Sequence, residues 1–171
     1  MDDYFNFSCI HCGLCCKKSF IAMTYFEYLK LKRIGKKIGK IPIFYMFKNH
    51  CSDWVVLMSA KPCPFLSADN RCTIYESRPT KCRMHPFNTT NNEDVIQEVD
   101  CPGWGGLKTT KMSDLKRDLV PYFSLWFAEF DRSNKKIEEL IAKNKIKFRK
   151  MNRQIQLMDQ KFDFFRFEIK K

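Results

Sequence analysis

The sequence predicts an α+β protein, in which a small cysteine-rich core with short strands is followed by a helical C-terminal extension. The chain has 171 residues, enough for one domain with an appendage, because typical domains contain about 100–150 residues. All nine cysteines lie between Cys9 and Cys101. Strand-like runs give way to helical patterns near Met112. We therefore expect a cysteine-cluster domain over residues 1–106 and a helical extension over residues 107–171.

The first predicted element is a helix over residues 24–35. Thr24 and Glu27 have the spacing of a capping box, and apolar residues follow at helical intervals. The β-branched and aromatic runs at 41–47 and 54–58 predict two strands. Shorter elements complete the predicted core, namely strands over 72–75 and 94–99, polar turns over 67–70 and 88–93, and a short helix over 77–83.

The predicted extension consists of two long helices. The first begins near Met112 with Ser113 as a suitable N-cap, and Pro121 marks a break or a kink. The aromatic stretch over 121–130 is interpreted as the packed side of this helix. A second long helix is expected over 133–162, where apolar residues recur at irregular helical spacing.

The cysteines indicate metal binding once a compartment is assigned. The first seven residues, MDDYFNF, carry two acids and no apolar run, so we expect no signal peptide there. No stretch reaches the roughly 18 apolar residues of a membrane helix. We therefore expect a cytoplasmic protein with reduced thiols. Nine thiols are an odd number, which does not suit a full set of disulfides, and metal ligation is the simplest explanation.

The N-terminal cysteines have chelate spacing. Cys9, Cys12 and Cys15 form two successive Cys-x2-Cys steps, each of which can bring two sulfurs to one metal or cluster. Cys16 follows directly, and adjacent residues do not easily chelate one tetrahedral ion. It is therefore left to serve a second metal, a different iron of a cluster, or nothing. Four further cysteines stand beside turn-forming residues, so eight thiols are expected to converge in two groups of four. They are Cys63, Cys72, Cys82 and Cys101.

The segments CIHCGLCC, CPFLSADNRCTIYESRPTKCRMHPF and CPGWG resemble, in this order, the CxxCxxCC cysteine-cluster family. The resemblance covers residues 9 to about 106. Members of that family are described as zinc- or iron-chelating or iron–sulfur proteins. The resemblance implies eight cofactor and metal ligands, namely Cys9, Cys12, Cys15, Cys16, Cys63, Cys72, Cys82 and Cys101. Cys51 falls outside the pattern, and we interpret it as a buried or free thiol.

Other polar residues near these cysteines have two interpretations each. His11 and His85 could coordinate metal, although second-layer donation or simple solvation suits them better because the thiols suffice. Arg78 and Arg83 flank Cys82 and could offset thiolate charge. A plain salt bridge of these arginines with Glu76 or Asp100 is an equally good explanation.

The main pair of alternatives concerns the identity of the metal. Structural zinc favours two compact pairs of ligands, whereas this chain has one compact group and four scattered cysteines. Overlapping Cys-x2-Cys steps with a further ligand from elsewhere are typical of ferredoxin-like iron–sulfur sites. The spacing therefore favours an iron–sulfur cluster, 4Fe-4S, over zinc. Zinc in a structural or interaction role stays the alternative.

The formal net charge of +12 exceeds what solubility requires. A basic helical face over residues 135–153 is expected to attract nucleic acid or an acidic protein, or else to be simply solvated. No nucleic-acid-binding motif accompanies it. Its cations are Lys135, Lys136, Lys143, Lys145, Lys147, Arg149, Lys150 and Arg153.

Two classes of function fit these observations. The first is electron transfer, or an accessory subunit of a redox or maturation complex, with the C-terminal helices binding a protein partner. The second is an iron–sulfur-dependent enzyme with an unligated iron site. No carboxylate pair, nucleophile–base set or phosphate loop is evident, so the sequence names no catalytic residue and favours a non-enzymatic protein.

Overall fold

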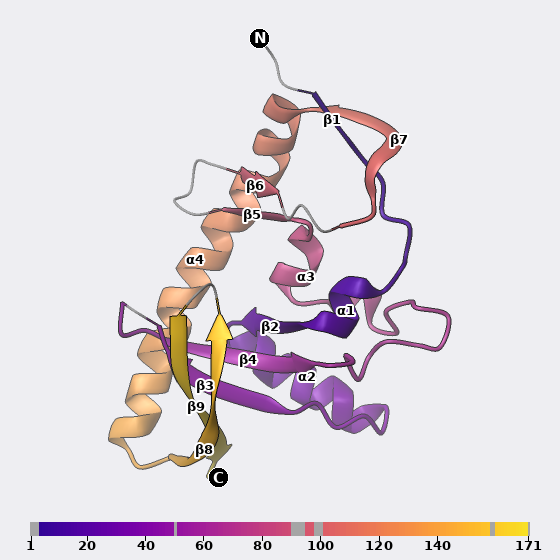
Figure 1. Cartoon of the computed structure of the whole chain (residues 1–171). Helices are drawn as coiled ribbons and strands as arrows, with labels where there is room; N and C mark the ends of the chain where they lie inside the picture. Colours follow the sequence, from indigo (N-terminus) through magenta and orange to yellow (C-terminus); the bar gives the residue numbers. More distant parts are fainter. Residues whose placement is uncertain (1–3, 50, 90–94, 98–100, 158–159, 171) are drawn as a thin grey trace. The chain divides into compact units, whose positions relative to one another are not determined.

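The computed structural model describes residues 4–49, 51–89, 95–97, 101–157 and 160–170. Helices and short strands both occur, so the predicted α+β class is confirmed. The chain divides into two compact units, and Figure 1 labels the helices and strands of both. Unit 1 comprises Met1–Ser19 and Lys61–Phe127, and unit 2 comprises Phe20–Ala60 and Ala128–Lys171. The predicted division at residue 106 stays a prediction.

Unit 2 contains a five-stranded sheet with the strand order β2-β4-β3-β9-β8. The central strand β3 pairs antiparallel with β4 through Tyr45 and Leu57, and with β9 through Tyr45 and Arg166. Both strands predicted in this region are confirmed, with slightly shifted bounds. The strands are β2 (Ser19–Met23), β3 (Phe44–Lys48), β4 (Trp54–Ala60), β8 (Ile146–Leu157) and β9 (Gln160–Ile169).

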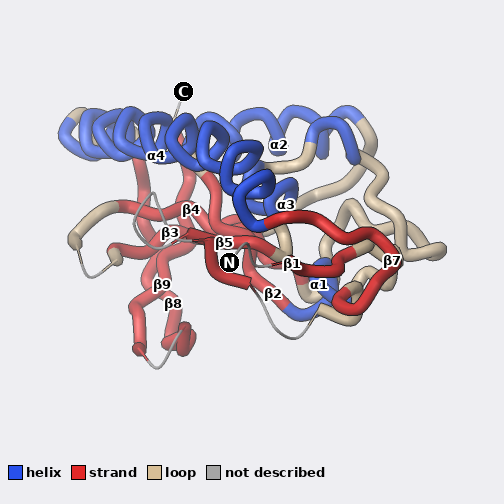
Figure 2. Tube along the Cα trace, turned by 90° about the horizontal axis from the view of Figure 1, so that it is seen from above, coloured by secondary structure: helices blue, strands red, loops and turns tan. Residues whose placement is uncertain are grey.

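The first predicted helix is confirmed as α2 (Tyr25–Lys37). Thr24 and Glu27 form the complete capping box, in which each side chain accepts a hydrogen bond from the other residue's backbone N–H. The Thr24 hydroxyl also donates to Glu129 Oε1 at 2.6 Å, and Ser133 Oγ accepts from the Tyr25 N–H at 2.6 Å. These bonds join α2 to the part of α4 in unit 2, and Figure 2 shows both helices on one face of the sheet.

Unit 2 has its own apolar core. Trp54 of β4 stacks on Phe148 of β8 with ring centroids 4.9 Å apart, and Tyr28 packs against Phe167 at 5.1 Å. Fully buried side chains come from α2, the sheet and α4, and include Leu31, Met46, Val56, Met58 and Ile137. A sheet of five strands covered by helices is large enough to be stable without further support.

The predicted extension is helical only in its first part. Helix α4 spans Met112–Ala142 without interruption, so Ser113 lies inside the helix rather than at its N-cap and Pro121 does not break it. The second long helix predicted over 133–162 is wrong beyond Ala142, because β8 and β9 form an antiparallel hairpin there. Asn144, whose φ of 52° is left-handed, lies where the helix ends.

Unit 1 has less regular structure. It contains two two-stranded sheets, β1-β7 and β5-β6, and the short helices α1 and α3. The predicted short helix is confirmed as α3. The strand predicted over 72–75 is wrong, because Cys72 makes only an isolated bridge with Leu66 and a 3-10 turn follows at Tyr75–Ser77. The bounds are β1 (Tyr4–Phe7), α1 (Leu14–Lys18), α3 (Thr80–Met84), β5 (Phe87–Thr89), β6 (Val95–Gln97) and β7 (Trp104–Lys111).

Two of the remaining sequence predictions are only partly covered by the structure. The turn expected over 88–93 begins at Asn88 in β5, and residues 90–93 lie outside the described residues. The strand expected over 94–99 is present as β6, and the residues flanking β6 also lie outside the described part. Within the described residues, none of the helices has both the length and the apolar character that crossing a membrane requires.

Candidate metal centre

None of the nine cysteines forms a disulfide. The eight cysteines of the predicted ligand set all belong to unit 1, although they are spread from residue 9 to residue 101. Cys51 belongs to unit 2 and is exposed in the turn between β3 and β4. Cys51 is thus exposed rather than buried, and it belongs to a different unit from the other eight cysteines.

The first loop turns sharply between its cysteines. His11 and Gly13 both have left-handed backbones, with φ of 52° and 70°. A Cβ at Gly13 would lie 3.1 Å from the Cβ of Asn70, so glycine suits both the conformation and the space at this position. The Cys16 N–H donates to the Gly13 carbonyl at 3.0 Å, and α1 begins at Leu14. This local structure places Cys15 and Cys16 on the same short helix.

One set of thiols, here named the first thiol group, consists of Cys9, Cys12, Cys15 and Cys101. The Ser8 N–H donates to the Gly103 carbonyl at 3.0 Å, which fixes the start of the first loop beside the turn that follows Cys101. Electrostatic interactions join the Cys101 thiol to those of the other three cysteines.

Aromatic packing supports the backbone beside the first thiol group. Phe7 lies 5.2 Å from Trp104 and 5.8 Å from Phe87 between ring centroids, and the last two rings are 5.7 Å apart. These three residues come from β1, β7 and β5, so the cluster ties together strands that are far apart in sequence. It also fixes the strand before Cys9 against the strand after Cys101.

The second thiol group consists of Cys16, Cys63, Cys72 and Cys82. The Cys63 N–H donates to the Cys16 carbonyl at 2.7 Å, which joins the end of α1 to the middle of the chain. Cys72 returns to the same region through its bridge with Leu66, whose N–H donates to the Cys63 carbonyl at 3.0 Å. The Cys63 thiol interacts electrostatically with the thiols of Cys16, Cys72 and Cys82.

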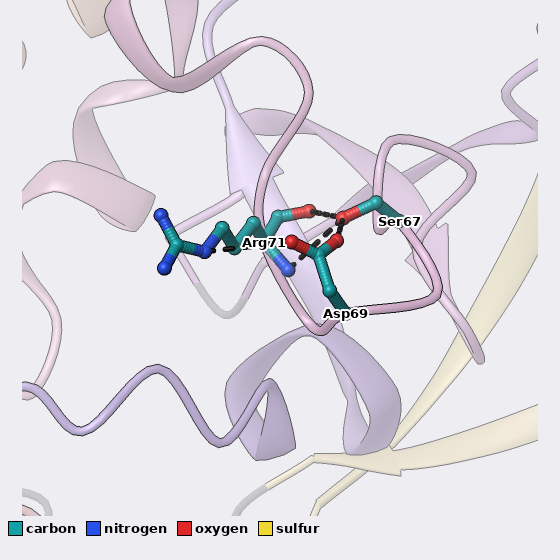
Figure 3. A network of polar contacts seen from close by, with 3 residues as sticks. All are labelled: Ser67, Asp69 and Arg71. Carbon is teal, nitrogen blue, oxygen red and sulfur yellow. Dashed lines mark hydrogen bonds and ion pairs between the residues drawn. The ribbon is translucent and has the colours of Figure 1, made fainter.

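A polar turn returns the chain to Cys72 (Figure 3). The Ser67 hydroxyl lies 2.5 Å from Asp69 Oδ1 and 2.7 Å from the Arg71 carbonyl oxygen, and it accepts from the Arg71 N–H at 3.1 Å. The hydrogen bond from Ser67 lowers the pKa of the Asp69 carboxyl. This confirms the turn predicted over 67–70, although the sequence did not show that it sets the position of a candidate ligand.

The arginines beside Cys82 are held by backbone carbonyls. Arg83 Nε donates to the Arg78 carbonyl at 3.0 Å, and a second guanidinium nitrogen donates to the Glu76 carbonyl. Arg78 Nε donates to the Tyr75 carbonyl at 2.9 Å, and its guanidinium lies 3.5 Å from the centroid of the Tyr75 ring. No ion pair with the Glu76 carboxylate occurs among the described residues, and Asp100 lies outside them.

The two histidines that the sequence offered as possible ligands both lie in or beside segments that carry cysteines. His11 is exposed in the first loop next to Cys12, and His85 is half-buried directly after α3. The structure thus places both histidines next to segments that carry cysteines.

Contact between thiols makes their ionisation unequal. The Sγ atoms of Cys15 and Cys16 lie 4.0 Å apart, and this contact, with burial, raises the pKa of Cys15. For Cys16 the contact with Cys15 lowers the pKa, but the contact with Cys63 and burial raise it more, and the result is about 11. Contact with Cys16 lowers the pKa of Cys63. Burial is the main reason for the raised pKa of Cys101.

The thiols of each group lie near one another, but they do not surround a common centre. Among the residues that the structure describes, no three Cys, His, Asp or Glu side chains form a finished ligand set for a metal ion. The grouping is nevertheless carried by backbone hydrogen bonds and not by the thiols alone. The donors fit thiophilic metals such as zinc and the iron of iron–sulfur clusters, because thiolates are soft, strongly donating ligands.

Comparison with known protein families gives a match. The sequence model of the CxxCxxCC family, described as "Putative zinc- or iron-chelating domain", matches residues 8–102. This range covers all eight cysteines of the two thiol groups. Neither a curated protein nor a solved structure matches the chain.

Proposed function

Since the chain belongs to the CxxCxxCC family of zinc- or iron-chelating domains, we propose that its eight thiols hold iron–sulfur clusters of the 4Fe-4S type. In this proposal the protein acts in electron transfer, or as an accessory subunit of a redox or maturation complex. The observation that carries the proposal is the gathering of eight cysteines into two thiol groups of four within unit 1.

The distribution of ligands supports iron–sulfur chemistry. In the first thiol group three ligands follow one another at Cys-x2-Cys spacing and a fourth comes from a distant turn, as in ferredoxin-like sites. In two-cluster ferredoxins the next cysteine of such a run ligates the other cluster. Cys16 has the corresponding role here, because its carbonyl and thiol both contact Cys63. The 4.0 Å contact between Cys15 and Cys16 would then bring two clusters close enough to exchange electrons.

Two alternatives to iron–sulfur electron transfer also have a specific chemical basis. Four thiolates per group also suit two structural zinc ions, because structural zinc is often held by four cysteine sulfurs. An enzyme would instead require an iron with an open coordination position. Four thiolates would occupy every iron of a 4Fe-4S cluster, which favours electron transfer over catalysis.

Metal identity is the first prediction. Anaerobically purified protein is expected to be brown, with broad visible absorption and stoichiometric iron and acid-labile sulfide, because iron–thiolate and iron–sulfide charge transfer colours such clusters. Elemental analysis and a sulfide assay on the same sample provide the measurement. Colourless protein that contains zinc and no iron would favour the structural zinc alternative.

We further propose that α4 binds the protein partner, since the second predicted helix is replaced by strands. Tyr122 and Leu125 lie one helical turn apart on α4 and are 54% and 69% exposed. Exposed apolar side chains at this spacing suit a helix or groove on a partner. Leu125→Asp is expected to weaken binding at least tenfold in calorimetry once a partner is known. Unchanged affinity would exclude this surface.

A further inference from the structure

The β8–β9 hairpin has one apolar and one basic face. Ile146 is buried, and Phe148 and Phe165 pack with Trp54 in unit 2. Strand residues alternate between faces, so the intervening positions point the other way. Within residues 145–150 and 165–170, whose side chains the structure describes, these positions, with one residue beyond each strand, carry five exposed cations and one acid, Glu168. The cations define the basic face, and they are Lys145, Lys147, Arg149, Arg166 and Lys170.

Two arginines of the basic face are directly opposite each other. Arg149 of β8 is the cross-strand partner of Arg166 in β9, and both side chains are exposed. Like charges in such a pair destabilise a sheet. Within the described part of the chain, no carboxylate forms an ion pair with either guanidinium. The fold therefore retains a repulsive pair at this position, and an anion would relieve that repulsion.

The arginine pair borders a hollow. A cavity of about 380 Å³ is lined by Arg149, Lys150, Met151 and Arg166. The register of the two strands shifts between Lys150 and Gln154, and such a bulge redirects side chains. The shift accounts for Lys150 lining the same hollow as Arg149, although the two residues are neighbours in a strand. Among the described residues that line the hollow, three are cationic and one is Met151, which gives this part of the hollow the character of an anion site.

We propose that the basic face of β8–β9 binds single-stranded nucleic acid, with one phosphate held between Arg149 and Arg166. The planar guanidinium group donates two parallel hydrogen bonds to phosphate, which a lysine does not. Lys145, Lys147 and Arg149 recur every second residue, about 7 Å apart along the strand. A ligand with one negative charge on every repeating unit matches this row better than an acidic protein with irregular carboxylates. The site lies in unit 2 and does not depend on the cysteines.

A binding assay tests this proposal with a charge-matched control. The probe is a fluorescent single-stranded oligonucleotide of about 16 nucleotides, followed by anisotropy over a series of salt concentrations. The double variant Arg149→Ala, Arg166→Ala is expected to lower the salt slope by about 0.7, because the one phosphate held by the two arginines contributes about 0.7 on a single strand. This slope corresponds to roughly 5-fold weaker binding at 0.1 M salt. The control Lys36→Ala, Lys37→Ala removes the same charge from the end of α2 and should leave the slope unchanged.

Three results of the binding assay would overturn the proposal. The first is an unchanged slope in the arginine variant, and the second is equal loss in the lysine control. The third concerns competition by oligoglutamate that carries the same charge as the oligonucleotide. If it displaced the labelled oligonucleotide at the same concentration as unlabelled oligonucleotide does, the ligand would be an acidic peptide instead. The arginine variant is also expected to melt at the same or a higher temperature than the natural protein, because it removes a repulsive pair. A lower melting temperature would contradict the premise that Arg149 and Arg166 repel each other in the absence of a ligand.

Discussion

Removal of the metal is expected to unfold unit 1 while unit 2 keeps its fold. Among its described residues, unit 1 contains only two-stranded sheets and short helices besides the first part of α4, and two-stranded sheets are marginal in isolation. Its candidate ligands come from distant loops, so metal-binding free energy is also folding free energy, on the order of 10 kcal/mol for tight structural sites. Unit 2 has a five-stranded sheet, and none of the eight candidate ligands belongs to it.

Hydrogen exchange with mass spectrometry measures this difference. After chelation under reducing conditions, amides of α3 and β7 should exchange rapidly, whereas those of α2, β3 and β4 should stay protected. The second set serves as an internal control in the same sample. Persistent protection of α3 and β7 in metal-free protein would show that unit 1 folds without metal.

The second prediction separates ligands from the remaining cysteine. Cys12→Ser and Cys82→Ser are each expected to lower the metal content and the melting temperature, because each removes one thiolate from a different thiol group. The stability loss should be several kcal/mol, in line with the loss of a structural site. Cys51→Ser is the matched control, since Cys51 is exposed in unit 2 and should change neither quantity.

Metal per chain and melting temperature are measured for the three variants side by side. Full metal content and stability in Cys82→Ser would remove Cys82 from the ligand set. Loss of a metal equivalent in Cys51→Ser would show that the division into eight ligands and one separate thiol is wrong.

Local sequence signals predicted the elements that local interactions decide. Thr24 and Glu27 predicted the start of α2 correctly because a capping box involves only neighbouring residues. The sequence likewise indicated α3, with Pro79 near its first turn, and the turn that begins at Ser67; in the structure Pro79 is the N-cap residue. These elements gain enough from nearby residues to form as the sequence suggests.

Elements that depend on distant partners were missed. Strand β1 pairs with β7 about a hundred residues later, and nothing in YFNF alone specifies this pairing. In β8 the good helix formers Lys, Arg, Gln and Met concealed the alternation of Ile146 and Phe148 with Lys147 and Arg149. The prediction of a basic helical face contains the same error. In the β8–β9 hairpin, alternate strand positions and not helical turns place the basic residues on one face.

The thiol groups show the same limit. Spacing identified Cys9, Cys12 and Cys15 as a chelating run and left Cys16 without an assigned role. The structure connects Cys16 to Cys63 through a backbone hydrogen bond of 2.7 Å, and it connects Ser8 to Gly103 beside Cys101. Sequence spacing carries no information on which loops meet, so the composition of each group became apparent only in the fold.

Counting metal in double variants tests the central claim most directly, namely that the eight thiols form two separate centres. Cys12→Ser with Cys101→Ser should lose no more metal than either single variant, because both residues serve the first thiol group. Cys63→Ser with Cys101→Ser should lose the metal of both groups. Iron, zinc and sulfide per chain, measured on the natural protein and these variants, give the answer. Additive losses within the first pair, or retention of one full centre in the second pair, would contradict the division into Cys9, Cys12, Cys15, Cys101 and Cys16, Cys63, Cys72, Cys82.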